Sequence, residues 1–194
     1  RILVENLLFP YRAGPVFVEA LLNARGQPGL DAAFADPPLS SEQILHPEKF
    51  LGPEPDWPVR LTARTDRWLG GDWTPADGDT LGEFHIGTWL RHHGTAPSTA
   101  EDAAAGWDGD RLWLFTRGGR LAAVWLSTWD TVEDAQAFED AAGRVLSGPE
   151  ASADGSLRQP PGTTTGWVRR DRDVLIWIAV PEARERRIRR RAFR

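Results

Sequence analysis

The stretch RLWLFTRGGRLAAVWLS, residues 111–127, decides the fold of this chain. Apolar residues recur with a period of two in Arg111–Thr116 and again in Leu121–Ser127. This period is typical of β-strands, and two adjacent glycines between such runs favour a tight hairpin turn. Strands joined by a tight turn must be antiparallel. We therefore predict an antiparallel hairpin centred on Gly118 and Gly119.

The segments around this hairpin extend the pattern to an α+β fold. A helix is expected before it, starting at Leu81 and stopping at Gly94, with Thr80 and Glu83 as a capping box. Asp130 and Thr131 are expected to cap a long amphipathic helix over 132–146, and a second hairpin follows over 166–180. The order helix, hairpin, helix, hairpin predicts an antiparallel sheet of about four or five strands, with helices packed on one side. A short strand is expected over 59–63, and a loop over 67–78.

Residues 1–50 have a helical pattern. One helix is expected to end at Pro10, a second to begin at Pro15 and end at Gly26, and a short third to cover 30–34. The proline-rich segment that follows marks a boundary. We predict three units: a helical segment over 1–56, a sheet domain over 57–181, and a basic helix or tail over 182–194.

Composition narrows the class of protein. The chain has 194 residues, 41% of them apolar, with ten tryptophans and no cysteine or methionine. Its net charge is −5, although residues 182–194 carry +5, so the rest is acidic and nucleic acid is an unlikely partner. No apolar run is long enough for a transmembrane segment. Without a starting methionine, we interpret the chain as part of a longer protein or as a processed product that has lost its leader. A place at the cell envelope or outside the cell is favoured over the cytoplasm.

His46 is the first candidate for a functional side chain. It follows the capping box of Ser40 and Gln43, and Pro47 disfavours helical angles at the residue before it, so the helix should end there. A histidine at such an end can stabilise an oxyanion, or it can simply bind the last carbonyls of the helix. Tyr11 and Arg12 are further candidates for a cleft, with a helix junction as the structural alternative.

Other polar and aromatic residues offer weaker candidates. Glu42 is expected near a cleft, and Trp107 and Trp129 fall at element ends, where they can stack on a ligand or close the sheet. The histidines of the helix after Leu81 do not have the i, i+4 spacing of a zinc pair. We therefore predict no metal site among His85, His92 and His93.

Several blocks resemble the C-terminal half of bacterial zinc metallopeptidases of the gluzincin type. They are FPYRAG (9–14), PPLSSEQILHPEKF (37–50), DTLGE (79–83), AAAGWDGDR (103–111) and WLSTWDT (125–131). In that family an H-E-x-x-H helix and a downstream glutamate hold the zinc, and both lie upstream of the matched region. This sequence has no H-E-x-x-H. The resemblance implies no cofactor in this chain, and zinc only if an upstream segment supplies it. It also implies that His46 steadies a tetrahedral intermediate, with Tyr11 or Arg12 as helpers.

Three functional classes remain open. The first is a non-catalytic C-terminal portion of a metallopeptidase-like protein that shapes a cleft or binds a peptide or protein, including the upstream part of the same protein. The second is a stand-alone binding or scaffold module. The third is attachment to an envelope or nucleic acid through the arginines of 184–194. The apolar stripes within 1–50 further predict an exposed hydrophobic face or dimer contacts.

Overall fold

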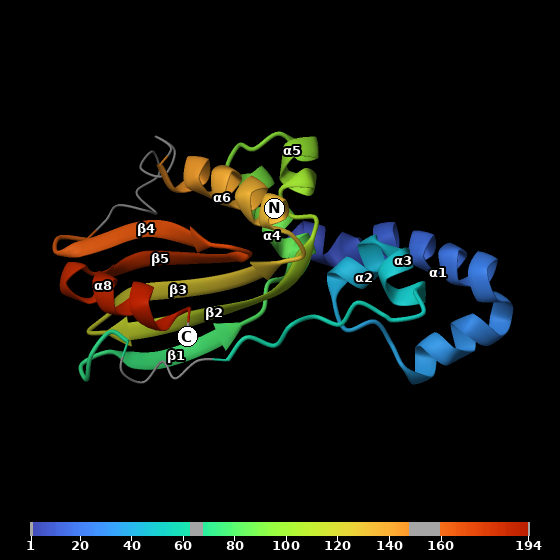
Figure 1. The fold of residues 1–194 in the computed structure, drawn as a ribbon, viewed down its shortest axis with the longest axis horizontal. Coiled ribbons are helices and arrows are strands. Elements are labelled where there is room, and N and C mark those ends of the chain that lie inside the picture. Colours follow the sequence, from blue (N-terminus) through green and yellow to red (C-terminus); the bar gives the residue numbers. More distant parts are fainter. Residues whose placement is uncertain (1, 63–67, 148–159, 194) are drawn as a thin grey trace.

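The computed structural model describes residues 2–62, 68–147 and 160–193, and its architecture is α+β (Figure 1). Within these ranges five strands form one antiparallel sheet in the order β1-β2-β3-β5-β4. The strands are β1 (Thr74–Asp79), β2 (Trp107–Arg117), β3 (Arg120–Trp129), β4 (Thr163–Arg170) and β5 (Asp173–Pro181). The predicted α+β class with an antiparallel sheet is therefore confirmed.

Both predicted hairpins are present. Gly118 and Gly119 have φ angles of 53° and 77°, the positive values that a type I′ turn requires at both central positions. The strands on either side pair along their length, from Trp107 opposite Trp129 to Arg117 opposite Arg120. The second hairpin joins β4 to β5, and β5 pairs with β3. The two hairpins thus meet through β3 and β5, which leaves β4 at one edge of the sheet and β1, beside β2, at the other.

The first edge of the sheet differs from the prediction. The expected loop over 67–78 contains β1, which pairs with β2 despite an irregularity between Pro75 and Asp77. Proline is tolerated here because an edge strand leaves one row of N–H groups unpaired anyway. Residues 59–62 of the expected strand over 59–63 are not a strand, and Ala63 lies outside the described residues. The Val59 N–H donates to the Asp108 carbonyl at 2.6 Å, which holds this segment beside β2.

Helices cover both faces of the sheet. On one face lie α4 (Gly82–His92), α5 (Pro97–Asp102) and α6 (Val132–Ser147), where Phe138 packs against Trp125 and Trp129. On the other face lies α8 (Glu182–Arg191), which buries Ile188 in a cluster with Trp177. The prediction of helices on one side only is wrong. β5 is apolar at consecutive positions, so both of its faces need cover.

The N-terminal helices form a group at one end of the sheet, next to α4 (Figure 1). They are α1 (Ile2–Ala35), α2 (Ser41–Leu45) and α3 (Pro47–Leu51). The expected break at Pro10 is wrong, because α1 continues through Pro10 and Pro15 and leaves helical angles only at Gly26 (φ 65°, ψ −163°). Proline disfavours a helix interior, but here Phe17 packs against Phe50 of α3, and tertiary contacts of this kind can outweigh local propensity.

The first turns of α1 expose apolar side chains to solvent, as the stripes in the sequence predict. Leu3, Leu7 and Tyr11 are 77%, 71% and 78% exposed. Exposed apolar surface of this extent commonly marks a contact with another segment or molecule. Among the described residues, no helix has both the length and the apolarity needed to span a membrane.

Candidate functional site

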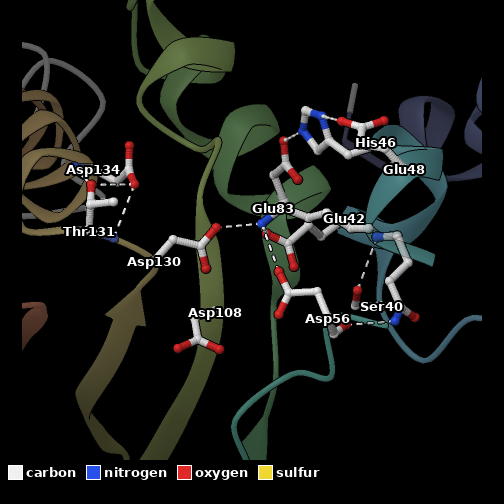
Figure 2. Close-up of polar contacts among 12 residues, drawn as sticks. Ser40, Glu42, His46, Glu48, Asp56, Glu83, Asp108, Asp130, Thr131 and Asp134 are labelled. Atoms are coloured by element: carbon white, nitrogen blue, oxygen red, sulfur yellow. Dashed lines mark hydrogen bonds and ion pairs between the residues drawn. The ribbon is translucent and has the colours of Figure 1, made fainter. Parts of the chain in front are cut away.

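The candidate site lies where the N-terminal helices meet α4 and the sheet (Figure 2). His46 stands between α2 and α3 in a non-helical conformation (φ −122°, ψ 78°), as the following proline predicts. The start of α2 is fixed by Ser40, whose hydroxyl accepts a hydrogen bond from the Gln43 N–H at 3.1 Å. The break between two short helices therefore sets the position of the imidazole.

Glu83 of α4 holds this imidazole from the other side of the junction. The Nε2 atom of His46 lies 2.8 Å from Oε1 of Glu83, and only 6% of Glu83 is exposed. The hydrogen bond to Glu83 raises the pKa of His46, an effect that burial of the ring opposes in part. The imidazole is thus both oriented by Glu83 and biased toward its charged form.

Lys49 forms the second polar contact of the junction. Its Nζ atom lies 2.6 Å from Glu42, 3.0 Å from Asp56 and 2.5 Å from Asp130 (Figure 2). Burial alone would lower the pKa of Lys49, but its hydrogen bonds to Asp130, Glu42 and Asp56 outweigh burial and raise it. Burial also raises the pKa of Glu42 to about 7, against the opposing effect of Lys49. One ammonium therefore ties α2, the segment after α3 and the end of β3 together.

Asp110 of β2 organises the start of α4. Its carboxylate accepts hydrogen bonds from the N–H groups of Leu81 and Gly82 at 2.9–3.1 Å and from the indoles of Trp107 and Trp125 at 2.9 and 3.0 Å. The expected capping box of Thr80 and Glu83 is therefore wrong, because an aspartate from a distant strand supplies the cap. This leaves Glu83 available to bind His46.

A pocket of about 430 Å³ opens beside the His46–Glu83 pair. Arg12 of α1 and Arg91 of α4 contribute its cationic groups, and Phe9 and Phe84 contribute rings that lie 4.2 Å apart. Arg91 is engaged by Glu5 at 2.8 Å, and this hydrogen bond lowers the pKa of Glu5. Among the charges of the pocket, Arg12 and His46 are therefore the cations best able to meet a ligand.

The structure brings some of the candidates from the sequence together and separates others. His46 and Arg12 line the same pocket, whereas Tyr11 does not line it. Glu42 is buried against Lys49 and does not line the pocket. Trp107 and Trp129 are only 2% and 0% exposed, so the structure places them in the core, as rings that close the end of the sheet.

The described residues do not fit a zinc site. The only group among them with three or more suitably close ligands is Glu42, Asp56 and Asp130, and the Lys49 ammonium already lies between these oxygens. Zinc in proteins favours histidine and cysteine ligands, which this trio lacks. His85 is engaged elsewhere, with Nδ1 2.7 Å from the Leu81 carbonyl. No chemical step is therefore assigned to a metal in this chain.

Sequence reasoning missed Lys49, Glu83 and Asp110 as organising residues. The sequence did offer a clue to Lys49, because it is the only lysine among the 23 lysine and arginine residues. Glu83 had a misleading one, because its spacing from Thr80 matches a capping box. Asp110 had none, because its partners come from other segments of the chain.

The fold and the site define a class of protein: an α+β domain with a five-stranded antiparallel sheet, joined by partly buried ion pairs to an N-terminal helical segment. The chain belongs to the family described as "Domain of unknown function (DUF8575)", which matches residues 72–189. This match covers the sheet, α4, α5, α6 and most of α8, and it begins after His46 and Lys49. No curated protein and no solved structure gives a significant match.

Proposed function

We propose that this chain is the non-catalytic C-terminal portion of a metallopeptidase-like protein, and that its junction pocket binds a peptide segment of the substrate. The observation that supports this most is the His46–Glu83 pair beside the pocket. The resemblance of residues 9–50 to the metallopeptidases supports it independently, since those residues include His46 and Arg12.

The chemistry of the pair suits an oxygen ligand. The hydrogen bond to Glu83 raises the pKa of His46 and so favours the imidazolium, which has a proton on each ring nitrogen and directs one of them to Glu83. The Nδ1 atom lies 3.7 Å from Oε1 of Glu48, close enough for an ion pair but too far for a hydrogen bond. The Nδ1–H of the imidazolium can therefore donate to a peptide carbonyl or a developing oxyanion. Glu83 acts here as a positioning residue for His46.

The exposed apolar turns of α1 support the first half of the proposal, that the chain is one portion of a larger protein. Leu3 and Leu7 lie in the same turns of α1 as Phe9 and Arg12, which line the pocket. A partner that covers these leucines would therefore lie next to the pocket and complete its wall. The upstream part of a metallopeptidase-like protein is the partner that we propose.

Peptide binding gives the direct test. A heptapeptide made of alanine, leucine and phenylalanine, blocked at both ends, is titrated into the protein at pH 6.5, and its affinity is measured by calorimetry. His46→Gln is expected to weaken binding about tenfold, the effect of one hydrogen bond from a charged donor. The control His93→Gln lies outside this pocket and should change affinity less than twofold. Equal losses in the two variants would contradict the proposal.

Peptidase activity tests the non-catalytic part. The purified chain with added zinc is incubated with fluorescein-labelled casein, and no hydrolysis above the buffer rate is expected. Chelator-sensitive hydrolysis would overturn this part. Sequencing the gene on the 5′ side of the Arg1 codon provides a second check. An encoded H-E-x-x-H motif there would support the proposal, and its absence would contradict it.

A further inference from the structure

A second groove is lined by other residues than the His46 pocket. It has a volume of about 690 Å³ and runs between the segment 58–62 and the first half of β2. Arg60 and Leu61 line one wall, and Arg111 and Trp113 line the other. No residue lines both this groove and the His46 pocket, so the two are separate sites.

Two arginines are the charged groups of this groove that are free to bind a ligand. Arg60 is exposed and Arg111 is half-buried, and neither guanidinium makes a hydrogen bond or ion pair with any residue of the described ranges. Asp110 also lines the groove, but its two oxygens already accept from two backbone N–H groups and two indoles. The Thr80 hydroxyl is engaged as well, since it donates to the Asp110 carbonyl at 3.1 Å.

The charge of the groove differs from that of the whole chain. The groove is lined by two guanidinium groups and by one carboxylate, that of Asp110, which is only 2% exposed. Its accessible charge is therefore positive, although the net charge of the whole chain is −5. Guanidinium groups present planar pairs of N–H donors that match carboxylate and phosphate oxygens. A ligand that satisfies both arginines must therefore carry an anionic, oxygen-rich group.

The walls between the arginines are apolar. Trp113 is half-buried, and its ring is fixed by an edge contact with Trp68 at 5.0 Å. Leu39 and Leu61 complete the surface, and Leu39 is 63% exposed. An apolar group placed here would remove these side chains from water, with a gain of about 25 cal/mol for each Å² of apolar surface buried.

We propose that this groove binds an organic anion, whose carboxylate or phosphate is held by Arg60 and Arg111 and whose apolar part packs against Trp113 and Leu61. The chemistry fits the carboxyl end of a peptide with an apolar last residue, and equally a phosphate monoester. The site is independent of the peptide pocket beside His46, so failure of one proposal leaves the other standing.

Matched ligands test the anionic group. N-acetyl-leucine and its neutral amide are titrated into the protein and followed by calorimetry, together with phenyl phosphate and inorganic phosphate. Binding of N-acetyl-leucine at least tenfold tighter than the amide supports a carboxylate ligand. Binding of phenyl phosphate, with inorganic phosphate at least tenfold weaker, supports a phosphate monoester. Equal affinity of the acid and the amide, without binding of phenyl phosphate, overturns the proposal, as does no saturable binding of any probe.

Variants test the location. Arg111→Gln and Arg60→Gln are each expected to weaken the tighter probe at least tenfold, with unchanged circular dichroism. Arg120→Gln is the matched control, because Arg120 is exposed at the turn between β2 and β3 and does not line the groove. It should change affinity less than twofold. Equal effects of all three variants would show that the anion binds through overall charge and would overturn the assignment to this groove.

Discussion

Replacement of Lys49 by methionine is the sharpest perturbation of the junction. The methionine keeps much of the apolar stem of the lysine but removes the ammonium that lies within 3.0 Å of Glu42, Asp56 and Asp130. Those three carboxylates have oxygens within 4.8 Å of one another. Without the cation they repel each other, and Glu42, which is 1% exposed, loses its partner in the protein interior.

The size of the effect follows from burial. Removal of one partner from a buried ion pair typically costs about 3–5 kcal/mol, because the remaining charge is left unpaired. Asp56 and Asp130 are 37% and 30% exposed, so water screens part of their repulsion. We therefore expect Lys49→Met to lower the free energy of unfolding by about 3 kcal/mol, at the lower end of that range.

Urea unfolding followed by tryptophan fluorescence measures this change. The control is Arg117→Met, which removes an ion pair to Asp72 between exposed side chains and should cost less than about 1 kcal/mol. The double variant Lys49→Met with Glu42→Gln should recover part of the loss, because the unpaired buried charge is gone. If Lys49→Met costs no more than Arg117→Met, the ammonium does not hold the junction together.

Three further predictions concern pH, the cap of α4 and the core. Burial raises the pKa of Glu42 from 4.5 to about 7, and Glu83 raises that of His46, so the folded protein holds protons that the unfolded chain has released. Stability should therefore fall as the pH rises from 5 to 8, and Glu42→Gln should flatten this urea-unfolding profile; a rising profile would contradict the assignment. Asp110→Ala leaves buried N–H groups unpaired and should cost about 3 kcal/mol in the same assay, with Asp110→Asn less harmful. Phe138→Ala should lower the free energy of unfolding by about 3–5 kcal/mol, and a loss below 1 kcal/mol would place Phe138 outside the core.

Local patterns in the sequence were sufficient for the main elements of the fold. The glycine pair at 118 and 119 and the flanking alternation predicted the central hairpin, because a type I′ turn depends on positive φ at two adjacent residues. Ser40 with Gln43, and Pro47 after His46, likewise predicted where α2 begins and ends. The errors at Pro10 and over 67–78 arose where packing and sheet pairing outweighed local propensity.

The arrangement of the junction was decided by tertiary structure alone. His46 and Glu83 are 37 positions apart, and Lys49 and Asp130 are 81 apart, so no local spacing relates them. They meet because α2 packs against α4 at the end of the sheet, and this packing places the charged groups side by side (Figure 2). The sequence by itself thus determined the elements and a histidine at a helix end, since these depend on backbone angles of neighbouring residues. The partners of that histidine depend on how distant elements pack, which the order of residues does not show locally.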